Sequence, residues 1–208
     1  MQYYFLILYI IFFEFVFSQT KTAKEIMQNV SKKYAEISNL KCEFTQTTIL
    51  SKIKKTQKVD GTLSLKKVNK FLIQYEHQTI SCDGKTVWTY VKQNNQVLID
   101  NYKDDKTSMS IDKIILNNFE NFFATFIKEE KIDEKIFNVI KLTPKDDKST
   151  IQNLKVWIKD DIIKKIEIED KKQNATTYFI KEIKFNQNIK DDLFNFIPPK
   201  ETEIIDLR

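Results

Sequence analysis

Few side chains in this sequence could carry out catalysis or bind a metal ion. His77 is the only histidine, Cys42 and Cys82 are the only cysteines, and the two glycines, Gly61 and Gly84, are not close together. A zinc site with two histidines, a four-thiolate zinc site and a glycine-rich phosphate loop are therefore excluded. The sequence indicates no metal ion and no organic cofactor.

The carboxylates offer no clear catalytic pair. Adjacent aspartates occur in four lysine-rich segments: Asp104-Asp105, Asp146-Asp147, Asp160-Asp161 and Asp191-Asp192. Neighbouring residues of a strand point to opposite faces, and turn residues mostly face water, so these pairs do not predict a general acid and base. His77 falls at an expected turn, where a lone histidine is usually solvated. We therefore expect no enzymatic activity.

The net charge of +5 does not indicate a nucleic-acid partner. Asp and Glu number 29 against 34 Lys and Arg, the two signs are interspersed, and Arg208 is the only arginine. Base readout and bidentate phosphate contacts rely on the planar fork of arginine, which lysine lacks. We expect a mixed, solvated surface and no nucleic-acid binding.

The N-terminus predicts export from the cytoplasm. Residues 3–13 form an uninterrupted apolar run of eleven. A helix needs roughly 20 residues to cross a bilayer, so this run suits a secretory signal better than a membrane span. Val16 and Ser18 are small enough for cleavage before Gln19. We expect a signal peptide at 1–18 and one mature domain at 19–208; an uncleaved membrane anchor is the alternative.

Export leaves two states open for the cysteines. A disulfide between Cys42 and Cys82 would close a loop of about 40 residues and could form outside the cytoplasm. Both residues lie in strand-like segments that the sequence does not place side by side. Two small buried thiols are the alternative.

The elements that position these residues follow from hydrophobic periodicity. Thr22 and Glu25 form a capping box that begins an amphipathic helix ending near Ser38. The apolar period then changes to two, which predicts an antiparallel meander from Leu40 to Ile99. Helical spacing returns over 111–129. Further strands are expected at 137–142, 154–158, 162–168 and 176–185. The pattern predicts an α+β fold, with a curved antiparallel sheet and helices over its concave face.

The helical insert expected at 111–129 admits two interpretations. Five of the nine residues from Phe119 to Ile127 are Phe or Ile. They fit an ordinary core helix, and equally a cover over a pocket for long acyl chains, because such a pocket binds through apolar area and needs few polar groups. Composition does not separate the two.

Five sequence strings resemble those of a known family. They are CEFTQ (Cys42–Gln46), GTLSLKKVNKF (Gly61–Phe71), CDGKTVWTY (Cys82–Tyr90), KLTPK (Lys141–Lys145) and LFNFIPPKETEIID (Leu193–Asp206). In this order and at closely similar spacing they resemble the periplasmic outer-membrane lipoprotein carrier proteins, the LolA type. No single string is decisive, but together they reach from the first strand to the C-terminus.

The resemblance implies a fold and a function. The fold would be an incomplete β-barrel of about eleven antiparallel strands around an apolar cavity, with a lid of short helices. The function would be that of a monomeric periplasmic chaperone. It would take the acyl chains of triacylated lipoproteins from an inner-membrane ABC transporter and deliver them to an outer-membrane acceptor or to the membrane itself.

The resemblance also implies site residues. The expected lining of the cavity comprises Phe44, Leu63, Leu65, Phe71, Ile73, Tyr75, Trp88 and Tyr90 on strands, with Phe122 and Phe126 on the lid; Phe71 is expected at the mouth. Many family members carry Arg-Pro-Asn where this chain has Lys67-Val68-Asn69. There the arginine bonds carbonyls of the lid, so Lys67 is the expected latch. Lysine cannot fork across two carbonyls, and the latch should be weaker.

Two other functions remain open at this stage. One is a regulatory module that senses lipid or lipoprotein with a similar half-barrel, although such regulators add a second domain. The other is a glycolipid-binding protein held at a membrane by an uncleaved N-terminus.

Overall fold

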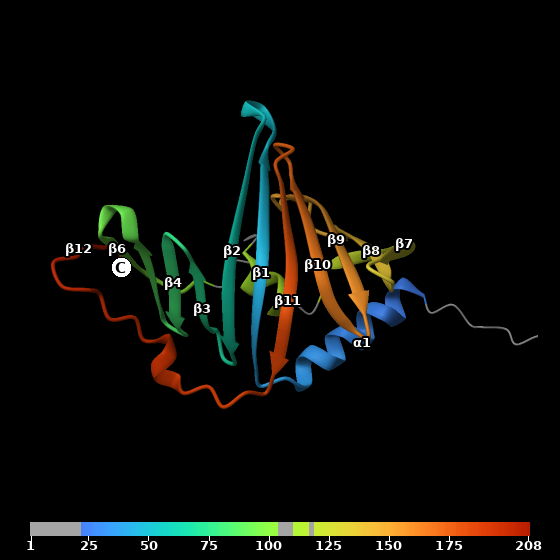
Figure 1. Cartoon of the computed structure of the whole chain (residues 1–208). Coiled ribbons are helices and arrows are strands. Elements are labelled where there is room, and N and C mark those ends of the chain that lie inside the picture. The colour runs from blue at the N-terminus through green and yellow to red at the C-terminus, as the bar shows by residue number, and fades with distance from the viewer. Residues whose placement is uncertain (1–21, 104–109, 117–118) are drawn as a thin grey trace, which may run out of the picture.

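The computed structural model describes residues 22–103, 110–116 and 119–208, so the expected signal peptide lies outside the described residues. Its central feature is one unclosed, curved sheet of twelve strands (Figure 1). The first six strands are β1 (Asn39–Leu50), β2 (Lys55–Lys66), β3 (Lys70–Tyr75), β4 (Gln78–Asp83), β5 (Thr86–Val91) and β6 (Gln96–Asn101). The others are β7 (Phe122–Ile132), β8 (Lys135–Pro144), β9 (Ile151–Lys159), β10 (Ile162–Asp170), β11 (Ala175–Phe185) and β12 (Glu203–Asp206).

The strand order confirms the expected incomplete barrel. From edge to edge it runs β12-β6-β5-β4-β3-β2-β1-β11-β10-β9-β8-β7. Neighbours pair antiparallel except β12, which pairs parallel with β6. Two successive meanders, β1–β6 and β7–β11, thus meet at the long strands β1 and β11 in the middle. The twelfth strand, beyond the eleven expected, is the C-terminal segment added to the edge.

Helix α1 (Ala23–Glu36) begins as expected. The Thr22 side chain accepts a hydrogen bond from the Glu25 amide, and the Glu25 carboxylate accepts one from the Thr22 amide, at 2.7 Å. Both are amides that a helix start otherwise leaves without a partner. Ala23, Ile26, Met27 and Val30 are buried. The helix lies across one end of the sheet near β7 and β10 (Figure 1).

The predicted helical insert is only partly helical. Helix α2 (Ile111–Leu116) is confirmed, but residues 122–132 form strand β7, and the expectation of a helix there is wrong. Phe122, Ala124 and Phe126 alternate with Phe123 and Ile127, so a period of two fits this stretch as well as a helical period. Phe and Ile favour strands, and pairing with β8 decides the outcome.

A C-terminal segment covers the convex face of the sheet. We call residues 187–202 the strap; they leave the end of β11 and pass over β2–β5 to reach β12 (Figure 1). The 3-10 turn Asp191–Phe194 lies within the strap. Phe194 is fully buried with Leu72 and Ile189, and its carbonyl accepts a hydrogen bond from the Ser81 hydroxyl at 2.7 Å. The strap is thus part of the folded domain.

Among the described residues, no helix combines the length and the apolar character that crossing a bilayer would require.

Candidate functional site: the apolar concave face and its cover

The floor of the site comes from every second residue of four adjacent strands. Cross-strand partners share a face of a sheet, and two rows define the concave side: Leu40, Leu65, Phe71 and Cys82 in one, Cys42, Leu63, Ile73 and Ile80 in the other. Leu63 and Leu65 are no more than 1% exposed, and Phe71 and Ile73 no more than 6%. The strand pattern therefore gathers five of the expected residues, these four and Phe44, into one buried apolar surface.

Phe44 lies at the centre of an aromatic group. Its cross-strand partner is Gly61, and a methyl group at Gly61 would approach the Phe44 Cζ to 2.7 Å. The ring occupies the space that glycine leaves open. It packs edge-on against Tyr75 at 5.7 Å and against Tyr178 at 5.8 Å between ring centroids. Tyr75 in turn donates a hydrogen bond to the Gln46 side chain at 2.8 Å.

The two tyrosines lie in a poorly solvated environment. Burial raises the pKa of Tyr75 to about 12 and also raises the pKa of Tyr178. Both hydroxyl groups therefore stay protonated at neutral pH. The aromatic part of the floor carries no charge.

Helix α2 covers this floor. Ile111, Ile114 and Ile115 are no more than 3% exposed and join the same apolar cluster as the floor residues, as does Phe119, which follows the helix. Figure 1 shows the short yellow-green helix behind the central strands. Phe122 and Phe126 pack against the cluster half-buried, but they do so from strand β7 and not from a lid helix. The cover inferred from sequence is therefore shorter than expected.

Trp88 and Tyr90 do not line the concave side. The register pairs Trp88 with Ser81 and Tyr90 with Thr79, one residue out of step with the floor rows, so both side chains point to the convex face. Tyr90 packs against Phe196 of the strap, at 5.6 Å between ring centroids. Both faces of β5 carry apolar residues. The aromatic face is covered by the strap, which comes about a hundred residues later in the sequence.

A carboxyl group lies within the cover. Asp112 is the second residue of α2 and is only 2% exposed. Burial raises its pKa, against opposing hydrogen bonds from the Ser110 side chain and from the amides of Asp112 and Lys113. The negative charge also contributes to the raised pKa values of Tyr75, Tyr178 and Cys82. Periodicity gives no indication that Asp112 is buried, because the helical pattern of this segment is set by its isoleucines.

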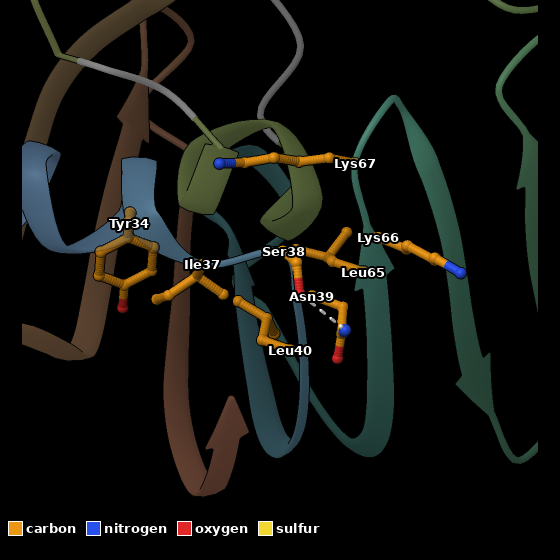
Figure 2. A pocket seen from close by; sticks show the side chains of 8 residues that line it. All are labelled: Tyr34, Ile37, Ser38, Asn39, Leu40, Leu65, Lys66 and Lys67. Atoms are coloured by element: carbon orange, nitrogen blue, oxygen red, sulfur yellow. Dashed lines mark hydrogen bonds between the residues drawn. The ribbon is translucent and has the colours of Figure 1, made fainter. Parts of the chain in front are cut away.

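Lys67 lies in the tight turn between β2 and β3 and contacts α1. Its amine donates a hydrogen bond to the Ala35 carbonyl in the last turn of α1, and its amide donates to the Ser38 carbonyl at 3.1 Å. Figure 2 shows the side chain beside the α1–β1 junction. A cation suits a helix C-terminus, where carbonyls lack amide partners. The resemblance implied a latch to carbonyls of the lid; in the structure the hydrogen bonds of Lys67 go instead to the end of α1 and to Ser38.

The lysines on either side of this turn bind the strap. Lys66 and Lys70 donate to the two carboxylate oxygens of Asp191 at 2.6 and 2.7 Å, and these hydrogen bonds lower the pKa of Asp191 to about 2. Asp191 lies in a turn and its side chain is 55% exposed, as expected, but the sequence carries no sign of its lysine partners, which lie more than a hundred residues earlier. The β2–β3 turn thus holds α1 through Lys67 and the strap through its neighbours.

Two described hollows border the floor: one is lined in part by Leu40 and Leu65, the other in part by Phe44 and Tyr75. One, of about 10 Å3, has room for about one water molecule between the end of α1 and Leu65 (Figure 2). The other, of about 430 Å3, has a mixed polar and apolar lining, in which Phe44 and Tyr75 lie beside Glu43, Gln74 and Lys181. Because the floor residues are almost fully buried, the apolar interior is closed in this arrangement.

The two cysteines are free thiols on the floor. Cys42 lies on β1 and Cys82 on β4, with β2 and β3 between them. Three strand spacings amount to about 14 Å, well beyond the roughly 6 Å between α-carbons in a disulfide. The buried-thiol alternative is confirmed. Burial raises the pKa of Cys42 to about 12 and that of Cys82 to about 11.

In the described part of the chain, no group of three or more His, Cys, Asp or Glu side chains is placed to hold a metal ion. What the concave face offers is an apolar surface made by both meanders.

These features define an open half-barrel with a buried apolar concave face under short helices. The family model described as outer membrane lipoprotein carrier protein LolA matches residues 35–197. The chain therefore belongs to the outer-membrane lipoprotein carrier family, as the sequence strings indicated. Family membership supports a role in carrying lipoproteins.

Relatives of known name agree with this assignment. The outer-membrane lipoprotein carrier protein of Histophilus somni is 28% identical, and the match covers 88% of each chain. That of Legionella pneumophila is 27% identical, and the match covers 97% of each chain. An uncharacterised protein of Methanocaldococcus jannaschii is 26% identical, and the chain spans about half (55%) of that relative's length. Among solved structures, an uncharacterised conserved protein of Thermus thermophilus shares the fold, with a TM-score of 0.57 at 14% identity over 88% of this chain and 98% of that one.

Proposed function

We propose that this protein is a periplasmic chaperone that shields the acyl chains of triacylated lipoproteins and shuttles them from the inner to the outer membrane. It would receive cargo from an inner-membrane ABC transporter and pass it to an outer-membrane acceptor or to the membrane itself. The work is binding and release, with no covalent chemistry. Family membership supports the lipoprotein cargo.

The observation that carries the proposal is the contrast between floor and cover. The floor belongs to an extended apolar cluster built from strands of both meanders, whereas α2 is a helix of six residues. A helix this short is unstable alone, so its position depends on its contacts with the rest of the domain. These are the apolar contacts of Ile111, Ile114 and Ile115 and the hydrogen bond from Lys113 to the Tyr102 hydroxyl. A ligand that supplies equivalent apolar contacts can displace it without disturbing the sheet.

Acyl chains supply such contacts. Each methylene transferred from water contributes about 0.8 kcal/mol, and burying an isoleucine contributes about 1.5–3 kcal/mol. The three isoleucines of the cover are therefore matched by a stretch of about six to eleven methylenes. A triacylated lipoprotein offers three chains, which is enough to replace the cover.

Two phenylalanines of β7 provide a matched test. Phe126 faces the apolar cluster and is half-buried, whereas Phe123 is 62% exposed and points to the other face. A carboxylate among acyl chains costs on the order of several kcal/mol, while one on the solvated face costs little. We expect Phe126→Glu to abolish loading of a triacylated lipopeptide and Phe123→Glu to leave loading unchanged.

Loading can be measured as the amount of lipopeptide that co-elutes with the protein on size exclusion. Circular dichroism of both variants checks that each remains folded. Equal loss of loading in folded Phe126→Glu and Phe123→Glu, or no loading by the unmodified protein, would refute the proposal. Co-elution of a free glycolipid in place of lipopeptide would favour the anchored glycolipid-binding alternative.

A further inference from the structure

The β1–β2 hairpin extends past its neighbours at one end of the sheet. β2 begins at Lys55, but its pairing with β3 begins only with Gly61 and Tyr75. Residues 55–60 therefore have no strand on that side, and Figure 1 shows this hairpin projecting farthest at the upper end. Residues 49–58, which we call the tip, are anchored where the Ser51 hydroxyl donates to the Gln173 carbonyl.

The tip combines exposed isoleucines with unbalanced positive charge. Ile49 is 45% exposed and Ile53 is 65% exposed. The tip also carries four exposed lysines, Lys52, Lys54, Lys55 and Lys58, and no acid occurs from residue 44 to residue 59. In the part of the chain that the structure describes, no salt bridge joins these lysines to an acid.

The adjacent turn extends the positive region. Lys171 and Lys172 are exposed between β10 and β11, next to the tip. The neighbouring acid, Asp170, is engaged within its own turn, where its carboxylate accepts hydrogen bonds from the amides of Lys172 and Asn174, each at 2.8 Å. The lysines of the tip and Lys172 are therefore exposed, whereas the Lys171 amine donates a hydrogen bond to the Asp147 carbonyl. Asp60, two residues after Lys58, pairs with Lys181.

A second hairpin shows that an exposed isoleucine alone does not produce this pattern. Ile136, beside the β7–β8 turn, is 57% exposed, which is close to the value for Ile53. There the flanking lysines are balanced by Asp133 and Glu134, and Lys131 pairs with Glu134 at 2.6 Å. The two hairpins match in apolar exposure and differ in net charge.

Exposed apolar side chains among lysines suit one kind of partner. At an anionic bilayer, isoleucines enter the headgroup layer while lysines stay at the level of the phosphates. Lysines also protect a projecting strand from pairing with other chains, but that role does not call for exposed isoleucines. We infer that the tip docks on the surface of a bilayer rich in anionic phospholipid.

Docking of this kind extends the proposed carrier function and rests on it for its purpose, since cargo has to be exchanged at a membrane. It places the tip against the headgroups and leaves α2 free to move. The interaction is weak and salt-sensitive, because exposed charges are screened beyond about 8 Å at physiological ionic strength. A shuttle that must leave the membrane requires this reversibility.

Vesicle binding tests the inference without cargo. The full protein is sedimented with phosphatidylglycerol–phosphatidylcholine vesicles and with pure phosphatidylcholine vesicles at several salt concentrations. We expect binding to the anionic vesicles only, weakening as salt rises. Lys54→Gln with Lys55→Gln should weaken binding about tenfold or more, and Ile53→Ser about fivefold. Ile136→Ser is the matched control and should bind as the unmodified protein does.

Three results would overturn the inference: no binding to anionic vesicles, equal binding to both vesicle types, or unchanged binding by the tip variants. Lipopeptide loading is measured on the same variants in solution, where no bilayer is present. Normal loading without vesicle binding removes the docking role and leaves the carrier intact. Vesicle binding without any loading removes the carrier function instead.

Discussion

Replacing Gly61 by alanine should destabilise the domain through the Phe44 ring. The added methyl would lie 2.7 Å from the Phe44 Cζ and 3.0 Å from the Gln74 carbonyl oxygen. Ordinary contact begins at 3.4 Å, so the ring must retreat by 0.7 Å (3.4 minus 2.7) or more. Tyr75 and Tyr178 pack against its edges and resist that movement.

The expected magnitude follows from two opposing effects. Overpacking a core costs about 1–3 kcal/mol. Alanine also reduces the conformational entropy of the unfolded chain relative to glycine, which stabilises the folded state by about 0.4–1 kcal/mol. This gain applies because Gly61 does not have a positive φ angle. We expect Gly61→Ala to lower the free energy of unfolding by about 1–2 kcal/mol, measured by urea denaturation.

A double-mutant cycle separates the ring contact from other effects of the methyl group. Phe44→Leu removes the atoms nearest to the new methyl, so the second substitution should cost much less in that background than in the unmodified protein. A coupling free energy near zero would show that Phe44 does not account for the effect. An increase in stability on Gly61→Ala alone would refute the packing argument.

Three further predictions concern the parts that hold the cover and the strap in place. Asp112 has a raised pKa in the folded state, so its contribution to stability is complete below its ordinary value of 3.8 and is lost as pH rises through the folded-state pKa. The free energy of unfolding of the unmodified protein should therefore fall as pH rises, and Asp112→Asn should abolish that fall. Identical pH profiles for the two proteins would contradict this. Lys67→Leu should speed hydrogen exchange in the last turn of α1 by an amount equivalent to about 0.5–1.5 kcal/mol, and unchanged exchange would show that the bond to Ala35 contributes nothing. Phe194→Ala should cost about 3–5 kcal/mol in chemical denaturation, whereas Leu193→Ala, at a position 39% exposed, should stay within about 0.5 kcal/mol. Similar losses for the last two variants would mean that the strap is not held by Phe194.

The fold could be predicted largely because local signals agree with it. The Thr22–Glu25 capping box begins α1, and the alternation from Leu40 to Ile99 defines strands whose register then brings Leu63, Leu65, Phe71 and Ile73 together. The family strings added what periodicity had not given, namely that the curved sheet forms an incomplete barrel. Neither signal depends on contacts between distant segments.

Failures of the sequence analysis occur where distant contacts decide. In β5, Val87 and Val91 alternate with Trp88 and Tyr90, so both faces are apolar and period two cannot say which is inside. Phe196 of the strap covers Tyr90 and fixes the answer. Asp191 is exposed in a turn as expected, but its partners Lys66 and Lys70 could not be inferred from the sequence around it. In both cases the strap supplies information that lies outside any local window.

The cover over the floor combines stabilising and destabilising features in a way that favours opening. Three isoleucines hold α2 against the sheet, yet the same six residues include Asp112, whose carboxylate is buried at a cost that raises its pKa. Phe119, the first residue described after α2, has a positive φ of 59°, a conformation that aromatic residues rarely adopt. Lys113 adds a hydrogen bond to the Tyr102 hydroxyl, but the rest of this short helix depends on apolar contacts and is opposed by a buried charge. In the proposed function, α2 is therefore the element that acyl chains would displace. Opening of α2 would let Asp112 regain water while the acyl chains take the place of the isoleucines.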